Sequence, residues 1–268
     1  MKQTIGFYRA VLRALKAADL PFLIGGAYAL ARYTAIDRTT KDLDLMVRRS
    51  DWPLIARALR TDGIYTRLVF PHWLGKALEG PAQVDIIFSG GNALTRVDDD
   101  WFTRATPARV LGFNVLLCPA EELLWSKAFV MERERYDGAD VLHLILRQGD
   151  RLDWTHLCDR FAGHERVLLS YLLLFEYAYP GERDTVPRWV IRRLLRAPVA
   201  EAEPGDRLCR GTLMSRAQFL VDIQKWGYAD ARLPPYGSMT PRDWMIWTNA
   251  INEHWSQDRR GHPRRRAG

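Results

Sequence analysis

Two aspartates, Asp42 and Asp44, stand one residue apart at the start of an apolar run that ends at Val47. On a strand, alternate side chains point to the same face, so both carboxylates would face one way while Leu43 and Leu45 face the core. Two carboxylates held side by side repel each other unless a cation lies between them. Hard oxygen ligands suit Mg²⁺, which usually keeps waters and substrate phosphates as its other ligands. The pair therefore predicts a magnesium site.

A pair of glycines, Gly25 and Gly26, separates a short apolar run from a helical pattern over residues 27–33. Without side chains at these positions, backbone N–H groups could approach a phosphate at the positive end of that helix. A further carboxylate, Asp85, stands between apolar neighbours in the strand-like run 83–88. We expect Asp85 to complete the metal site.

These motifs, in this order, resemble the nucleotidyltransferase superfamily that includes DNA polymerase β. The resemblance is clearest over residues 22–88. It looks closer still to the small bacterial nucleotidyltransferases related to abortive-infection type II toxins and to aminoglycoside nucleotidyltransferases. The resemblance implies metal binding by Asp42 and Asp44, completion of the metal site or base catalysis by Asp85, and triphosphate binding by Gly25 and Gly26.

The resembling families also carry a helical lysine and a later acidic motif. Lys127 follows Pro119 in a helical pattern, and Asp140 ends the acidic segment 132–140. The resemblance implies that Lys127 contacts the triphosphate, whereas the alternative is a surface lysine whose stem covers apolar residues. Asp140 could orient Lys127, an arginine or the water shell of the metal. Asp137 lies one turn away and is equally well explained as a helix cap.

Two polar segments flank the predicted strands. Arg38 lies in a polar link, and two interpretations of it are equally good: a contact to phosphate, or an ordinary solvated side chain. We interpret residues 71–77 as a loop that holds His72, Trp73 and Lys76. Either His72 and Trp73 cap the core, or the loop flanks the site, with Lys76 near phosphates and His72 near the acceptor.

The chemistry implied by this resemblance is transfer of a nucleoside monophosphate from a triphosphate, ATP or CTP, to a hydroxyl acceptor. Two Mg²⁺ ions, or Mn²⁺ in their place, would bridge the aspartates, and pyrophosphate would leave. The acceptor stays open between RNA, as for a toxin with an antitoxin partner, and a small molecule such as an aminoglycoside. A cationic aminoglycoside would need an acidic pocket, for which residues 98–100 or Glu132 and Glu134 are candidates. The alternatives are an inactive nucleotide-binding protein on the same scaffold and a nuclease.

The chain of 268 residues is 47% hydrophobic, which is enough for one large or two modest domains. We expect an α/β (α+β) fold, with a catalytic domain over residues 1–118 whose mixed β-sheet is flanked by helices. A mostly helical domain would follow over 119–258, and a basic disordered tail over 259–268. The net charge of +7 favours anionic partners such as nucleotides or RNA.

The cysteines, three in number and widely spaced, predict neither a disulfide framework nor a zinc site. No window approaches the roughly 18 apolar residues that a membrane span needs. The opening residues form an amphipathic pattern rather than a secretory signal. A cytoplasmic protein without a membrane partner is therefore expected, in an oligomeric state that the sequence leaves open.

Overall fold

The computed structural model describes residues 2–37, 42–198 and 207–258. Arg38, which the sequence made a candidate phosphate contact, lies outside these ranges, and so does the arginine-rich segment 259–268.

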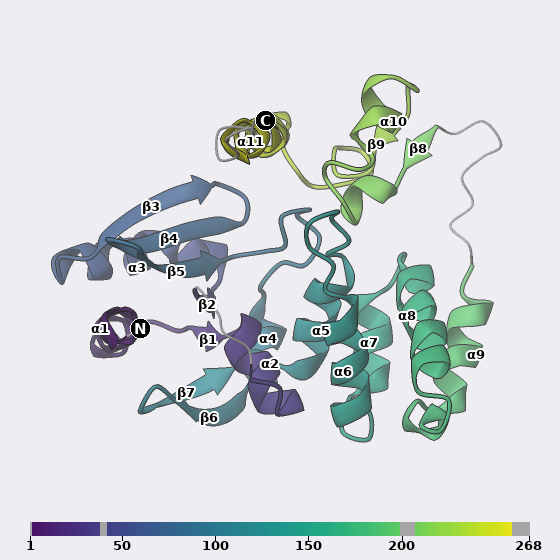
Figure 1. Cartoon of the computed structure of the whole chain (residues 1–268), viewed down its shortest axis with the longest axis horizontal. Coiled ribbons are helices and arrows are strands. Elements are labelled where there is room, and N and C mark those ends of the chain that lie inside the picture. The colour runs from purple at the N-terminus through teal and green to yellow at the C-terminus, as the bar shows by residue number, and fades with distance from the viewer. Residues whose placement is uncertain (1, 38–41, 199–206, 259–268) are drawn as a thin grey trace, which may run out of the picture.

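A seven-stranded mixed sheet forms the centre of the N-terminal half (Figure 1). Its strands lie in the order β3-β4-β5-β2-β1-β7-β6. Strand β2 is parallel to β5 and antiparallel to β1, while β1 is parallel to β7. The strands are β1 (Leu23–Ile24), β2 (Leu43–Met46), β3 (Tyr65–Phe70), β4 (Leu74–Glu79), β5 (Ala82–Ile87), β6 (Thr106–Val110) and β7 (Phe113–Leu117).

Alternation along β2 and β5 decides which side chains reach solvent. Leu43 and Leu45 on β2, like Val84 and Ile86 on β5, are completely buried. They pack in one apolar cluster with helices α1 (Lys2–Ala17) and α3 (Trp52–Thr61). Since successive side chains of a strand point to opposite faces, the aspartates between these residues project from the other face of the sheet.

The other face of the sheet packs against the helical half. Met46, which shares a face with Asp44, belongs to a second apolar cluster together with residues of α2 (Gly26–Thr34), α5 (Ala120–Ala128) and α6 (Gly138–Gln148). The helix α4 (Asp99–Thr103) contributes Trp101 to the same cluster. The sheet face that carries the aspartates therefore looks toward the helices.

Helices dominate the chain after β7, as the sequence predicts, and Figure 1 shows them stacked beside the sheet. The remaining helices are α7 (Trp154–Arg160), α8 (Glu165–Ala178), α9 (Arg188–Arg196), α10 (Leu220–Gln224) and α11 (Pro241–Asp258), with 3₁₀ turns η1 (Arg49–Asp51), η2 (Arg183–Thr185) and η3 (Gly211–Leu213). Two short parallel strands, β8 (Leu208–Cys209) and β9 (Ala229–Asp230), form a separate small sheet. Helix α11 then returns to lie beside β3.

The predicted fold class is confirmed, with a mixed sheet flanked by helices and a mostly helical second half. One local prediction was wrong. The segment 71–77, interpreted as a loop, contains the first part of strand β4, so Lys76 projects from a strand.

Within the described ranges, no helix combines the length and the apolar character needed to cross a bilayer. Cys118, Cys158 and Cys209 are buried free thiols. The sequence prediction that they form no disulfide framework is consistent with these positions.

Candidate active site

Asp44 and Asp85 lie side by side at the centre of the sheet. They are direct partners in the register of the parallel strands β2 and β5. Asp42 precedes β2 at a bend, two residues before Asp44. Both Asp44 and Asp85 are intermediate in exposure, so their carboxylates are partly screened from solvent. The structure thus brings the predicted acids to one face of adjacent strands.

Lys76 extends this row of charged side chains by one strand. It pairs with Asp85 in the register of β4 and β5, and its Nζ lies 2.9 Å from Asp85 Oδ1. The same ammonium group donates to Gln83 Oε1 at 3.0 Å, and Gln83 Nε2 donates to Asp42 Oδ2 at 3.3 Å. Gln83 was missed in the sequence, although its position two residues before Asp85 places both on the same face of β5.

The glycine pair packs directly against Asp44. The Gly25 N–H donates to the Asp44 backbone carbonyl at 2.9 Å, and Gly26 begins helix α2 with φ +51°. A Cβ atom on Gly26 would overlap Asp44 Oδ2. Only glycine combines this left-handed backbone with so close an approach to a carboxylate. The positive end of α2 therefore lies against the acidic row, where an anion bridged by a cation would be favoured.

Lys127 is held in a buried ion-pair cluster. Its Nζ lies 2.9 Å from Asp137 Oδ2 and 2.8 Å from Asp140 Oδ2, and the exposed fraction of Lys127 is 8%. Asp137 and Asp140 are also buried. The two aspartates therefore fix the direction of the lysine side chain. Its positive charge is near enough to Asp44 to lower the pKa of that carboxyl.

Arg135 is a charged residue at the site that the sequence analysis did not single out. Its Nε and Nη2 donate to Asp137 at 3.1 and 3.0 Å. Its side chain is nevertheless 69% exposed, so it stands in open space beside the carboxylates. The Arg135 charge lowers the pKa of both Asp44 and Asp85. No local pattern in the sequence marks it, because its place near the acids depends on how α5 and α6 position its loop.

The pKa of Asp44 is strongly shifted by its surroundings. Burial, followed by the charges of Asp42 and Asp85, raises the pKa of Asp44 to about 7. Burial also raises the pKa of Asp85, although the ion pair with Lys76 works in the opposite direction. Tyr8 of α1, almost completely buried, has a pKa raised to about 12 by burial, by Tyr28 and by the charge of the three acids. An excess of negative charge therefore gathers here.

Asp42, Asp44 and Asp85 are the side chains at this site that could bind a metal ion. Within the described part of the chain, no three His, Cys, Asp or Glu side chains are grouped closely enough to hold a metal ion. The donor chemistry still fits Mg²⁺, because this ion binds through one or two carboxylates and takes waters and phosphates as its other ligands. The repulsion that raises the pKa of Asp44 is the kind of strain that a divalent cation relieves.

His72 is placed with aromatic residues. Its Nε2 lies 3.0 Å from the Gly91 carbonyl, and its ring meets Trp247 of α11 edge to face. Trp247 also contacts Phe70 and Trp73, with ring centroids 4.7 and 5.1 Å away. Burial lowers the pKa of His72. His72 thus helps to hold α11 on the turn between β3 and β4.

The C-terminal segment also binds the loop that carries Arg135. Glu132 accepts from Ser215 Oγ at 2.5 Å and from the Arg216 N–H at 2.9 Å. The Arg216 guanidinium lies 3.9 Å from the centre of the Trp247 ring. Through these contacts the segment connects the Arg135 loop with the β3–β4 turn.

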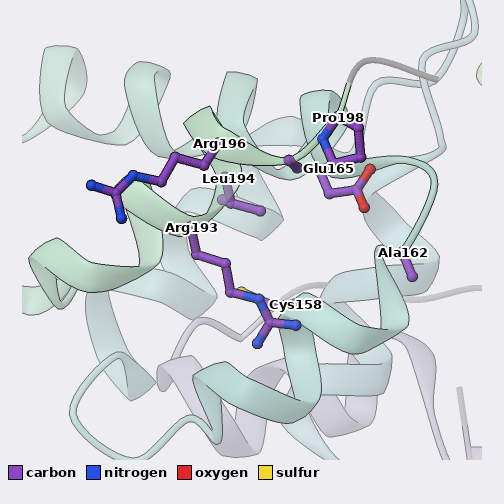
Figure 2. Close-up of a pocket in the computed structure, with 8 residues that line it drawn as sticks. Cys158, Ala162, Glu165, Arg193, Leu194, Arg196 and Pro198 are labelled. Atoms are coloured by element: carbon purple, nitrogen blue, oxygen red, sulfur yellow. The ribbon is translucent and has the colours of Figure 1, made fainter. Parts of the chain in front are cut away.

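A separate hollow of about 480 Å³ lies in the helical half, between α7, α8 and α9 (Figure 2). Cys158, Glu165 and Arg193 are among the residues that line it. None of the residues predicted to form the active site lines this hollow. The candidate site is therefore the group of carboxylates Asp42, Asp44 and Asp85, called the carboxylate row below, and not this hollow.

No family model matches the sequence, and no curated protein matches it. Two of the solved structures to which the chain is similar are of the same protein. The solution structure of antibiotic-resistance factor ANT(2'')-Ia has a TM-score of 0.44 and 14% identity, and the match covers 67% of this chain and 98% of that one. A crystal structure of ANT(2'')-Ia in complex with adenylyl-2''-tobramycin has a TM-score of 0.43 and 17% identity, over 67% and 99% of the two chains. At these values the likeness decides neither activity nor substrate.

Proposed function

We propose that this protein transfers a nucleotidyl group from a nucleoside triphosphate to a hydroxyl acceptor and releases pyrophosphate. The observation that carries the proposal is the placement of Asp44 and Asp85 as register partners, with Gly26 at the start of α2 against the Asp44 carboxylate. Paired acids next to the N-terminus of a helix provide both halves of a metal–triphosphate site.

Asp42, Asp44 and Asp85 would hold Mg²⁺, with Mn²⁺ as a substitute. Bound metal would lower the pKa of the acceptor hydroxyl and neutralise charge on the departing pyrophosphate. Lys76 contacts Oδ1 of Asp85, and a carboxylate has a second oxygen that can bind a cation.

The other residues of the site have separate tasks in the proposed reaction. The backbone N–H of Gly26 at the start of α2 would hold a phosphate, while the Gly25 N–H stays bonded to the Asp44 carbonyl and fixes the turn. Arg135, exposed beside the acids, would contact the triphosphate directly. Lys127 would act as a fixed positive charge, because its ammonium group is already bound by Asp137 and Asp140. Arg38 stays a predicted phosphate contact.

In the transfer step, the acceptor oxygen attacks the α-phosphorus and forms the new P–O bond. The bond from the α-phosphorus to the bridging oxygen breaks, and pyrophosphate carries away the electron pair. Asp85 accepts the proton of the acceptor hydroxyl, and the raised pKa of its carboxyl suits this role. The positive end of α2 and the charge of Arg135 stabilise the transition state.

The acceptor is better explained as RNA or a neutral small molecule than as an aminoglycoside. Of the acids that could form a pocket for a polycation, Asp98 binds Arg160 through both carboxylate oxygens, at 2.8 and 2.7 Å. Asp99 binds Arg48, and Glu132 is bound by Ser215 and Arg216. These contacts engage Asp98, Asp99 and Glu132 within the protein.

The test uses ribonucleoside triphosphates labelled at the α-phosphate, with Mg²⁺ and separate pools of RNA and small-molecule acceptors. The Asp42→Asn/Asp44→Asn variant is compared with wild type, and Asp62→Asn, an exposed acid after α3, is the matched control. We expect transfer by wild type and control and none by the double variant. A label on the γ-phosphate should appear in pyrophosphate. Transfer of the γ-label to acceptor, or cleavage of RNA, would contradict the proposal.

The Lys76–Asp85 ion pair favours one second candidate, a protein that binds a triphosphate without transferring it. In that case Lys76 would keep Asp85 away from the acceptor. Thermal unfolding with added triphosphate and Mg²⁺ would then show stabilisation, while no acceptor pool becomes labelled.

A further inference from the structure

A second cavity, of about 410 Å³, lies between the loop after β5, the turn before α8 and the C-terminal segment. The residues that line it come from parts of the chain far apart in sequence, among them Asn92, Arg96, His164, Arg210, Arg232 and Tyr236. No residue assigned above to the nucleotidyl-transfer site lines this cavity. It is therefore a separate site.

The lining is basic. Arg96 and Arg210 are exposed at the cavity, and Arg232 is buried. The described residues that line the cavity include no Asp or Glu. Arg210 is close enough to His164 for its charge, after burial, to lower the pKa of that imidazole. Arg96, Arg210 and Arg232 thus all contribute to the lining, whereas Asp230, which forms an ion pair with Arg232, does not.

Arg232 is the most informative of these residues, because only 1% of it is exposed. Its Nε donates to Asp230 Oδ1 at 2.9 Å, and its Nη2 donates to Asp230 Oδ2 at 2.6 Å. Asp230 also accepts from the Trp244 indole at 2.8 Å. Arg232 Nη1 has no hydrogen-bond partner among the described residues. A buried guanidinium N–H without an acceptor is costly, and Asp230 is already engaged on the opposite edge.

We propose that this cavity binds the phosphate group of a small molecule, with Arg232 Nη1 as the buried donor and Arg96 and Arg210 as charged donors at the rim. Guanidinium groups match the oxygens of a phosphate, and charge-assisted bonds to them are strong. The volume leaves room beyond the phosphate for a small organic group. The phosphate can be inorganic or can belong to an ester, and the cavity chemistry is the same for both.

The test measures binding of inorganic phosphate and of a sugar phosphate by calorimetry at constant ionic strength. Two variants are needed. Arg232→Lys keeps a positive charge beside Asp230 but removes Nη1, and Arg96→Ala/Arg210→Ala removes the rim without touching the buried pair. Arg13→Ala, an exposed arginine on α1, is the control. We expect affinity to fall at least about tenfold in both variants and to stay unchanged in the control.

The probes distinguish the sources of the phosphate. Tighter binding of the sugar phosphate than of inorganic phosphate identifies an ester as the ligand class, and equal binding identifies the phosphate alone. The ring resonances of His164 should shift on titration of wild type, which locates the ligand at this cavity. Phosphate affinity that is unchanged by the rim variant, or a silent His164, would overturn the proposal. Because the readout is binding, loss of the proposed transferase activity would not affect it.

Discussion

Two groups of charged residues in this protein are built in opposite ways. In the helical half, buried Glu122 is contacted by His156 at 2.7 Å and by Arg160 at 2.9 Å, and Arg160 also binds Asp98. In the carboxylate row, Asp44 and Asp85 share one face of the sheet, and Asp42 stands just before β2. Among the described residues, Lys76 forms an ion pair with Asp85 of this row.

The pKa shifts show what this difference means. Burial raises the pKa of Glu122, but its neighbours His156 and Arg160 oppose the rise. For Asp44, burial and the neighbouring acids act in the same direction, with weaker opposition from Arg135 and Lys127. The helical group is therefore balanced and structural, whereas the carboxylate row holds excess negative charge for a cationic ligand. Repulsion among these carboxylates destabilises the protein without a ligand, and binding of a cation relieves it.

The largest expected effect comes from Gly26→Ala. Its Cβ would overlap Asp44 Oδ2, and φ is +51°, so we expect a loss of about 4 kcal/mol in the free energy of unfolding and loss of nucleotidyl transfer. Gly63→Ala is the matched control, since φ is +76° and nothing lies within 4 Å of the new Cβ. It should cost about 1 kcal/mol, the backbone strain alone. Equal costs in urea unfolding would show that Gly26 does not approach the carboxylate.

Removing a base from the balanced group should destabilise the fold without changing the chemistry. Arg160→Met leaves buried Glu122 with His156 alone, and we expect a loss of about 3 kcal/mol in stability. Transfer activity per folded molecule should stay at the wild-type level. Arg57→Met, at an exposed position on α3, should change stability by less than about 0.5 kcal/mol. A selective loss of activity in Arg160→Met would mean that the helical group belongs to the active site.

Removing an acid from the carboxylate row should stabilise the metal-free protein, whereas removing a base from the helical group destabilises it. The folded-state pKa of Asp44 is raised to about 7, so its ionised form destabilises the metal-free protein above that pH, and the penalty disappears below about pH 4. Asp44→Asn should therefore gain about 2 kcal/mol near pH 8 with EDTA present and little near pH 4. Urea unfolding at both pH values measures this. A destabilised variant near pH 8 would contradict the claim of excess negative charge.

The smallest expected effect concerns Asp98. Burial alone would raise its pKa, but the hydrogen bonds and charge of Arg160 lower it below the usual value. Its contribution is therefore present above about pH 4 and is lost as pH falls through the lowered value. Because the side chain is 44% exposed, solvent screening limits the cost of Asp98→Asn to about 1 kcal/mol near pH 7. If the loss of stability in Asp98→Asn were as large at low pH as at pH 7, the ion pair with Arg160 would not be its cause.

The parts of the site that lie close together in sequence could be predicted. Alternation along a strand placed Asp42 and Asp44 on one face, and an apolar run marked the strand of Asp85. Gly25 and Gly26 stood before a helical pattern. The mixed sheet was expected from the resemblance to nucleotidyltransferases, and the helical second half followed from the change of periodicity after Pro119.

The parts that were missed depend on packing between distant segments. Arg135 reaches the acids only because α5 and α6 bring its loop to the sheet, and no local pattern contains this information. Strand β4 was hidden by Pro71 and Gly75, which are typical of a loop. In the structure Gly75 lies against the Trp52 ring, where a Cβ would overlap it. Its role is to admit a core tryptophan and not to form a turn.

The most direct test of the central claim measures Mn²⁺ binding by electron paramagnetic resonance, with and without a non-hydrolysable triphosphate. Wild type and Arg160→Met should bind Mn²⁺ more tightly when the nucleotide is present, because the phosphates complete the set of ligands. Asp42→Asn/Asp44→Asn should lose this binding while it stays folded. If the double variant binds Mn²⁺ and nucleotide as wild type does, the carboxylate row is not the site.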